Sequence, residues 1–428
     1  MGDLTLPAKL TDAALFAVMP VHGDLCIHAA VDLKRTFSQD ELERAVAATV
    51  RDFPVLGCRY EPRFWRDRWV PVDAPIGAIV HDGGQPADVE AETIAWVRRP
   101  IDGTRDRPLR IVSMKRGEGS RLLLSVLHLA VDGSGAAAVA HVLGSHLYGA
   151  LPGVSPDAER GLRGALGRLS WAHLPVLAKD AVVGMLQPLR TVLAAKRERP
   201  FPKGPTLEAS WRHLVVSAAE LARVRERAGA RGARVNDLVV AAAARAAGTR
   251  SSDGPVVVLY TMDLRRYARA PRLTATNTST FLAAFVPRAD LATLASAVSS
   301  VAAITAGHRR GLAGPAFLLG PVLLSIGTPH AAVRRLVRHL QTVAVDLPLS
   351  RGMIITNVGR LDDGLKPFAD DLEDIRIIGP IVENVDVPAV VAFGFRGQLC
   401  LELFAPPGLA AEALDELEAE LRAALELE

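Results

Sequence analysis

The strand-like and helix-like segments of this chain fall into two groups separated by a long stretch of different composition. Apolar strand-like runs and amphipathic helix-like runs alternate over residues 1–150 and again over residues 206–428. Residues 151–205 are rich in Pro, Gly and basic side chains, which is typical of a partly helical connection. A chain of 428 residues also exceeds one ordinary domain. We predict an α/β fold with mixed sheets, in which lobes at 1–150 and 206–428 are joined by a crossover segment at 151–205.

Several elements follow from local patterns. An amphipathic helix is expected over residues 39–52, because Ser38 can cap its first turn and the apolar positions share one face. The remaining apolar runs predict strands at 25–31, 108–114, 121–127, 211–217, 255–265 and 398–404. Helical composition is found at 134–148, 218–233 and 235–248, and an amphipathic helix closes the chain.

Charge and cysteine content exclude several classes of protein. Lys plus Arg number 50 and Asp plus Glu number 47, a balance that gives no reason to expect nucleic acid as a partner. Cys26, Cys58 and Cys400 are odd in number and far apart, so neither a disulfide framework nor a zinc site is expected. The N-terminus lacks a basic segment followed by an apolar core, so no secretory signal is expected. These features predict a cytoplasmic protein without a bound metal or cofactor.

One apolar segment raises the question of membrane contact. No Asp, Glu, Lys or Arg occurs between Gly311 and Val333, a length that a membrane-spanning helix needs. Pro315, Pro321 and Pro329 interrupt it, and each proline breaks helical hydrogen bonding. We therefore expect a buried or surface-docked helix, with peripheral lipid contact through residues 311–333 as a further hypothesis.

The residues that most strongly indicate chemistry are 127–133, LHLAVDG. A strand-like run ends, His128 follows it, and Asp132 comes four residues later, just before a helix. An imidazole can take a proton from an attacking hydroxyl or amine near neutral pH. Taken alone, the spacing also suits a structural histidine at a strand end. A metal-ligand interpretation lacks a third ligand with suitable spacing.

The pattern His128-x-x-x-Asp132-Gly133 resembles the active-site signature of a known superfamily. That superfamily includes chloramphenicol acetyltransferase, nonribosomal peptide condensation domains, polyketide-associated acyltransferases and wax-ester synthases. Further stretches resemble it in the expected order, at residues 52–60, 99–114, 233–246, 260–267 and 354–363. The resemblance implies two chloramphenicol-acetyltransferase-like lobes in a V-shaped arrangement, with the active site at their interface.

The resemblance also implies roles for single residues. His128 matches the catalytic base, which deprotonates a hydroxyl or amine acceptor for attack on a thioester of coenzyme A or of a phosphopantetheinyl carrier protein. Asp132 matches an aspartate that pairs with an arginine, and Arg265 is our candidate for that arginine. Gly133 leaves room for the donor arm, because a side chain there would crowd it. Asn357 and Gly359 match a second motif, for which we expect a role in bracing the loop.

Two departures from the condensation-domain pattern narrow the prediction. Leu127 stands where condensation domains have a first histidine, and TNVGR at 356–360 stands where they have Asp-Phe-Gly-Trp-Gly. Both favour a stand-alone acyltransferase that forms esters or amides in natural-product or lipid biosynthesis. The resemblance implies a monomer, because the two lobes of one chain already build the site. The alternative is a non-catalytic relative that binds or recruits a carrier-bound partner.

A basic run follows the crossover segment. Glu220 and Glu226 interleave with it, which is typical of a solvated helix face. A sharper hypothesis is a docking patch for coenzyme A phosphates or an acidic carrier protein. Its members are Arg223, Arg225, Arg227, Arg231 and Arg234.

Overall fold

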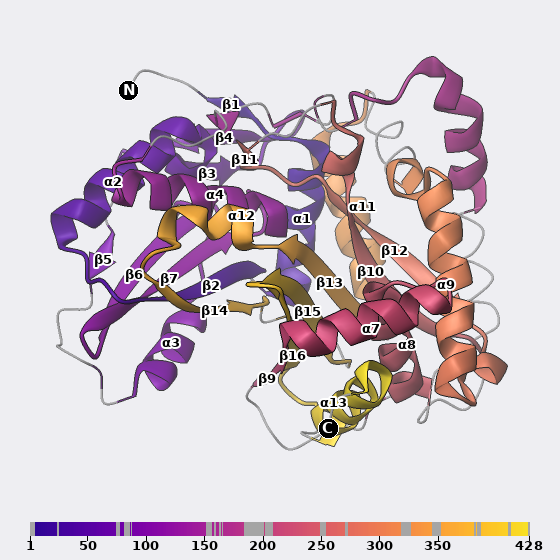
Figure 1. Cartoon of the computed structure of the whole chain (residues 1–428). Helices are drawn as coiled ribbons and strands as arrows, with labels where there is room; N and C mark the ends of the chain where they lie inside the picture. Colours follow the sequence, from indigo (N-terminus) through magenta and orange to yellow (C-terminus); the bar gives the residue numbers. More distant parts are fainter. Residues whose placement is uncertain are drawn as a thin grey trace.

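Two α/β lobes lie side by side in the computed structural model, as predicted (Figure 1). The structure describes residues 5–23, 25–73, 78–80, 86, 88–150, 156–157, 160–161, 164, 166–183, 201, 209–248, 254–269, 273–317, 327–344, 352–380, 382, 387–409 and 412–426.

The first lobe is built on a five-stranded sheet with strand order β14-β2-β7-β6-β5. Every residue of β2 and β7 is buried, because helices cover both faces of the sheet. α2 and α4 pack together on one face, whereas Trp96 of α3 packs against Ala30 and Leu123 on the other. The elements are β2 (Cys26–Leu33), α2 (Gln39–Asp52), β5 (Ile79–Val80), α3 (Val89–Val97), β6 (Leu109–Arg116), β7 (Gly119–Leu127), α4 (Gly133–Leu147) and β14 (Leu372–Ile378).

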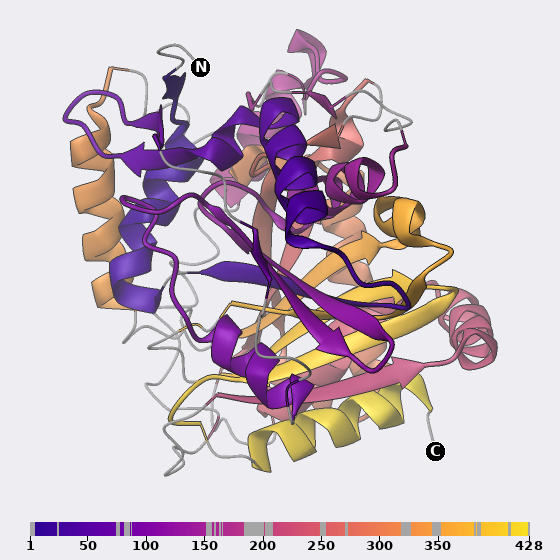
Figure 2. The ribbon, with the colours of Figure 1, turned by 90° about the vertical axis from the view of Figure 1, so that its left-hand side faces the viewer.

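A small antiparallel sheet, β1-β4-β3, borders the first lobe. Its strands are β1 (Leu6–Pro7), β3 (Cys58–Glu61) and β4 (Arg68–Pro71), and the short helix η1 (Pro54–Gly57) precedes β3. α1 (Leu10–His22) follows β1 and packs along α11 (His330–Ala344), which comes from the second half of the chain. Figure 2 shows α11 as the orange helix at the outer edge of the molecule.

The second lobe is built on a six-stranded sheet with strand order β12-β10-β13-β15-β16-β9. α8 packs against β10 and β13, with α9 and α13 on either side of it. The strands are β9 (Ser210–Val216), β10 (Val256–Asp263), β12 (Ser279–Val286), β13 (Met353–Arg360), β15 (Ala389–Phe395) and β16 (Gln398–Ala405). The helices are α7 (Ala218–Ala230), α8 (Val235–Gly248), η3 (Leu264–Tyr267), η4 (Arg288–Leu291), α9 (Leu294–Arg310) and α13 (Glu412–Leu425).

The second half of the chain also completes the sheet of the first lobe. β14 pairs antiparallel with β2, and α12 (Asp362–Leu365) with η6 (Lys366–Phe368) packs on α4. The range 206–428 therefore contributes to both sheets, which a division into consecutive lobes does not express. Of the crossover segment, η2 (Trp171–His173), a helical stretch at 174–183 and the short pairing of β8 (Pro156–Asp157) with β11 (Leu273–Thr274) are described. The boundaries at 150 and 205 stay a prediction.

Local sequence signals account for several elements. The helix expected at 39–52 is α2, and the Ser38 hydroxyl accepts a hydrogen bond from the backbone N–H of Glu41 at 3.3 Å. The Glu41 carboxylate accepts one in return from the Ser38 backbone at 2.9 Å, which completes a capping box.

All three cysteines are buried. Burial raises the pKa of Cys58 to about 11 and that of Cys400 to about 12, so neither thiol is an activated nucleophile.

The apolar segment at 311–333 is described only in part. Leu312 and Ala316 are buried and Phe317 is exposed, whereas residues 318–326 lie outside the described residues. Among the parts of the chain that the structure describes, no helix has the length and apolar character needed to cross a membrane.

Candidate active site

His128 lies at the end of β7, in the turn that leads to α4. Its backbone N–H donates to the carbonyl of Leu25 at 3.1 Å, and the N–H of Ala130 donates to the carbonyl of Leu127 at 2.9 Å. These bonds fix the turn at the carboxyl end of β7, the central strand of the first sheet. The imidazole is half-buried and faces a loop of the second half of the chain.

Asn277 holds the imidazole from the opposite side. Its Nδ2 donates to the carbonyl oxygens of His128, at 2.6 Å, and Leu129, at 3.3 Å, which orients the amide. Its Oδ1 then lies 3.1 Å from His128 Nδ1. Because an amide oxygen only accepts hydrogen bonds, this contact assigns the proton of a neutral imidazole to Nδ1. Nε2 is thereby left with a lone pair.

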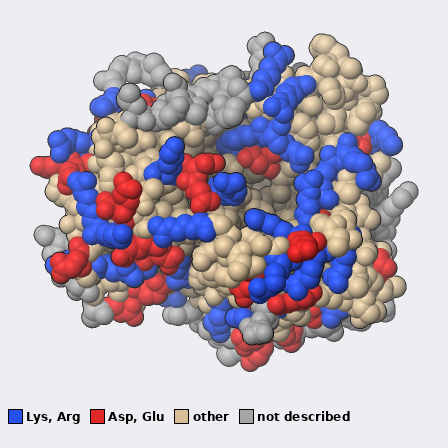
Figure 3. All heavy atoms as spheres, in the orientation of Figure 1, with Lys and Arg blue, Asp and Glu red and all other residues tan. Residues whose placement is uncertain are grey.

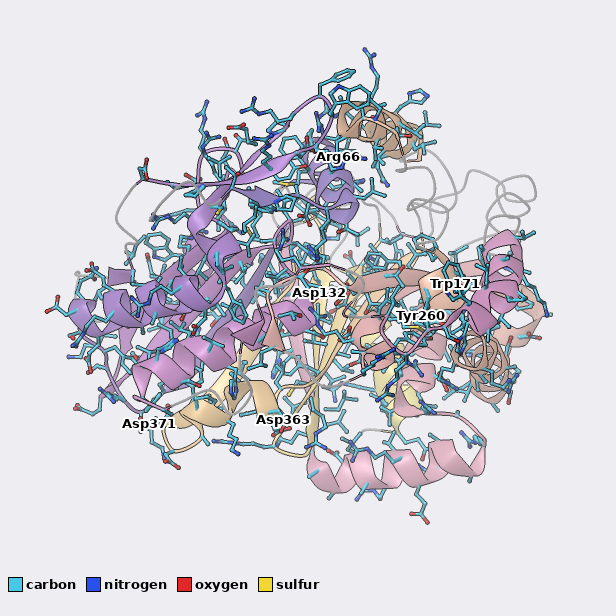
Figure 4. All side chains as sticks on the ribbon, turned by 90° about the horizontal axis from the view of Figure 1, so that it is seen from above. Arg66, Asp132, Trp171, Tyr260, Asp363 and Asp371 are labelled. Atoms are coloured by element: carbon cyan, nitrogen blue, oxygen red, sulfur yellow. The ribbon has the colours of Figure 1, made fainter. Side chains whose placement is uncertain are left out.

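The Asp132 carboxylate caps α4 and joins the two halves of the chain. It accepts hydrogen bonds from the backbone N–H groups of Gly135, at 2.8 Å, and Thr278, at 2.7 Å. Arg265 Nη1 lies 3.0 Å from the same carboxylate. Burial alone raises the pKa of Asp132, but the charge of Arg265 and these hydrogen bonds outweigh burial and lower it. Asp132 is therefore an ionised structural anchor. Figure 4 shows it between the two lobes.

Arg265, in η3, pairs with Asp132, and it is the residue named as that partner on the resemblance to the superfamily. It also lies 3.3 Å from Asp263 and donates to the carbonyl of Thr276 at 2.9 Å. Burial lowers the pKa of Arg265, but Asp132 and Asp263 outweigh burial and raise it. One guanidinium thus ties the His128–Gly133 turn to the loop that carries Asn277.

The second motif predicted from the sequence lies against Gly133. A Cβ at Gly133 would come within 3.3 Å of Val358, which is tight but within the reach of a small adjustment. Asn357 is exposed, and its Oδ1 accepts from the backbone N–H of Gly359 at 2.9 Å while its Nδ2 donates to Asn236 at 3.2 Å. Gly359 has a φ of +87°, a conformation that favours glycine. These contacts brace the end of β13.

An apolar cavity lies beside Gly133 and Val358. Its volume is about 30 Å³, which exceeds the space that one water needs. The small side chains of Ala136, Ala137 and Ala140 on α4 line it together with Gly133 and Val358. It places apolar surface next to the His128–Gly133 turn.

Charged side chains that sequence reasoning missed contact the backbone and the loop around the site. Arg160 Nη1 lies 2.9 Å from the Asp12 carboxylate, and its Nη2 donates to the carbonyl of Ala130 at 3.0 Å. Lys9 donates to the hydroxyl of Thr276, one residue from Asn277. Burial, assisted by the charge of Arg160, lowers the pKa of Lys9 to about 7.

The basic run lies on α7 and just after it. Arg223, Arg225, Arg231 and Arg234 are exposed, whereas Arg227 is half-buried and pairs with Glu426. Figure 3 shows blue side chains over α7 with red ones among them. The described contacts do not link these arginines to the residues around His128. Across the described residues, no group of three or more His, Cys, Asp or Glu side chains is arranged to hold a metal ion.

Solved structures with the same architecture cover nearly the whole chain. Trichothecene 15-O-acetyltransferase from Fusarium sporotrichioides matches with a TM-score of 0.69 and 11% identity, over 99% of this chain and 96% of that one. The first condensation domain of the CDA synthetase matches with a TM-score of 0.66 and 18% identity, over 98% and 95%. Polyketide synthase associated protein 5 from Mycobacterium tuberculosis matches with a TM-score of 0.61 and 16% identity, over 98% and 97%.

The chain has the condensation-domain fold. No protein-family model and no curated protein sequence matches it. At these identities the likeness shows the fold.

Proposed function

We propose that this protein is a stand-alone acyltransferase, which moves an acyl group from a thioester to a hydroxyl or amine with His128 as general base. The observation that carries the proposal is the contact of 3.1 Å between His128 Nδ1 and Asn277 Oδ1. It leaves the lone pair of Nε2 available to an acceptor proton.

The proposed reaction needs only the acceptor, the thioester and the imidazole of His128. Nε2 takes the proton of the acceptor as its oxygen or nitrogen attacks the thioester carbonyl, whose π electrons move to the oxygen. Collapse of the tetrahedral intermediate expels the thiolate, and the thiolate takes the proton back from Nε2. The products are an ester or amide and a free thiol.

The environment of Asp132 supports a division of roles. Its carboxylate is occupied by Arg265 and by the N–H groups of Gly135 and Thr278. It therefore fixes the shape of the turn, whereas Asn277 orients the imidazole. Because both supporting residues come from the same chain as His128, we propose that a monomer suffices for activity.

The donor and acceptor are proposed by class. We propose acyl-coenzyme A or an acyl phosphopantetheinyl carrier protein as donor, with the α7 arginines as its docking patch. The setting we propose is natural-product or lipid assembly in the cytoplasm, because the similar structures include a trichothecene acetyltransferase and a condensation domain of the CDA synthetase. The alternative of a non-catalytic carrier-binding protein is disfavoured by the oriented imidazole, which binding alone would not need.

The decisive experiment measures thiol release from a panel of acyl thioesters supplied with mixed alcohols and amines. His128→Ala should lower the acceptor-dependent rate by about two to four orders of magnitude. His141→Ala is the matched control, because His141 is also half-buried and hydrogen-bonds the carbonyl of Asp363 at 2.9 Å. Equal release by native protein and His128→Ala would show that His128 is not the base. If native protein releases no thiol with any donor in a panel that includes carrier-bound thioesters, the result favours the non-catalytic carrier-binding protein.

A further inference from the structure

α11 is a surface helix that is anchored firmly along one side only. The backbone N–H groups of His330 and Ala331, in its first turn, donate to the carbonyls of Trp65 and Phe64 at 3.0 Å each. The backbone N–H of Asp67 donates to His330 Nδ1 at 3.1 Å, and the Asp67 carboxylate pairs with Arg334. The helix is therefore held in a fixed orientation against α1 and the β3–β4 turn.

A second side of α11 presents apolar groups to solvent. Leu336, Leu340 and Val343 are spaced by about one helical turn and are 51%, 54% and 45% exposed. Phe64 and Trp65, in the turn that binds the start of the helix, are 65% and 62% exposed. Figure 2 shows this turn and α11 along the same outer edge of the molecule.

A third side of α11 is basic and borders a groove of about 600 Å³. Arg335, Arg338 and His339 line the groove, with Phe16 and Pro62 on its opposite side. Arg334 is neutralised by Asp67, whereas Arg335 and Arg338 have no acidic partner among the described residues. Figure 4 shows Arg66 beside α11, which adds a cation near the exposed aromatic pair.

We propose that this face of the protein, formed by α11 and the β3–β4 turn, docks on an anionic lipid surface. An amphipathic helix that lies in a membrane interface combines an apolar row with basic side chains, and aromatic residues favour the headgroup level. The arginines would meet lipid phosphates while the aliphatic row and the aromatic pair enter the acyl boundary.

Other occupants fit the same face less well. A soluble anion uses the cations but leaves Leu336, Leu340 and the aromatic pair in water. A second copy of the chain in a two-fold dimer places the exposed arginines of both copies at one interface. The proposal concerns a surface separate from the residues around His128, so it does not depend on the proposed acyl transfer.

The test is co-sedimentation of the full chain with vesicles of phosphatidylglycerol and phosphatidylcholine, and with vesicles of phosphatidylcholine alone. Binding should require phosphatidylglycerol and weaken as salt rises. The variants Arg335→Glu/Arg338→Glu and Leu336→Ser/Leu340→Ser should each weaken partitioning by at least about tenfold. Arg223→Glu/Arg225→Glu on α7 is the matched control and should bind as native protein does.

Three results would overturn the proposal. One is equal binding to both vesicle types or to neither. Another is an equal loss of binding in the α7 control, which would mean that basicity alone is responsible. The third is a dimer in solution that Leu336→Ser/Leu340→Ser converts to a monomer, which would assign the face to self-association. Unchanged thermal unfolding of the variants excludes misfolding, and thiol release with soluble donors reports separately on the proposed catalysis.

Discussion

Asn277 forms two hydrogen bonds with His128: its Oδ1 lies 3.1 Å from the ring nitrogen Nδ1, and its Nδ2 donates to the backbone oxygen at 2.6 Å. One amide thereby fixes both the tautomer of the imidazole and the turn that carries it. Because Asn277 is in the loop before β12 and His128 follows β7, the site is complete only when both halves of the chain are in place.

Replacing Asn277 should impair catalysis more than binding. In Asn277→Ala the ring loses its orienting acceptor, and we expect kcat to fall by about tenfold to a hundredfold with a much smaller change in KM. Steady-state kinetics with a soluble thioester donor measures this. An effect on KM alone would mean that Asn277 contacts substrate and does not position the base.

The variant Asn277→Asp tests the electrostatics of the contact with the ring, although it also removes the two hydrogen bonds that Asn277 Nδ2 donates to carbonyl oxygens. It keeps the acceptor for Nδ1 but places a negative charge beside the ring, which favours the protonated imidazole. The acidic limb of the profile of kcat/KM against pH should therefore move to higher pH. An unmoved limb would indicate that the titrating group is not His128.

Removal of Arg265 should destabilise the whole protein. Arg265→Ala leaves the buried Asp132 carboxylate without its charged partner, and we expect the free energy of unfolding to fall by about 3–5 kcal/mol. Arg105→Ala serves as control, because Arg105 is exposed and lies 3.6 Å from an exposed Asp102. Such surface pairs contribute at most about 1 kcal/mol. Urea unfolding compares the two, and equal losses would contradict the anchoring role.

Lys9 should make stability depend on pH. Its pKa is lowered by burial, and by the charge of Arg160, from 10.5 to about 7 in the folded protein, although Asp12 and Asp132 act in the opposite direction. Between these values the unfolded chain holds the proton that the folded chain has lost, so the free energy of unfolding rises with pH. The free energy of unfolding of native protein minus that of Lys9→Met should increase by a few kcal/mol from about pH 7 to about pH 10. A difference that stays constant or falls with pH would show that Lys9 is charged in the folded state.

Sequence reasoning succeeded where a short stretch determines its own structure. Ser38 directly precedes an amphipathic run, so the cap of α2 could be predicted from local sequence, and the structure adds Glu41 as the second half of a capping box. The turn at 127–133 could be placed in the same way, because an apolar run ends there and a helix begins. The pairing of Asp132 with Arg265 needed the resemblance to a known superfamily, since no local pattern links residues so far apart.

The parts that sequence reasoning missed depend on contacts between distant segments. β14 carries an ordinary strand pattern, and nothing in that pattern indicates that it pairs with β2 of the other lobe. Asn277 occurs among small polar residues, TATNTST, that read as an ordinary loop. Asp12 and Arg160 are charged residues of a kind usually found at the surface. Only the folded structure shows that each neutralises the other in the interior.

The arginines of α7 provide the final prediction, because they separate donor docking from a merely solvated helix face. If they attract the phosphates of coenzyme A or an acidic carrier protein, Arg223→Glu/Arg225→Glu should raise KM for the donor by about tenfold at low ionic strength. Salt screens exposed charges, so the same variant should differ from native protein by less than about twofold near 0.5 M salt. Arg335→Glu/Arg338→Glu on α11 carries the same change in charge at a different surface and should leave KM for a soluble donor unaltered. An equal rise in both variants would assign the effect to net charge, and no rise in either would leave the α7 arginines as solvated surface.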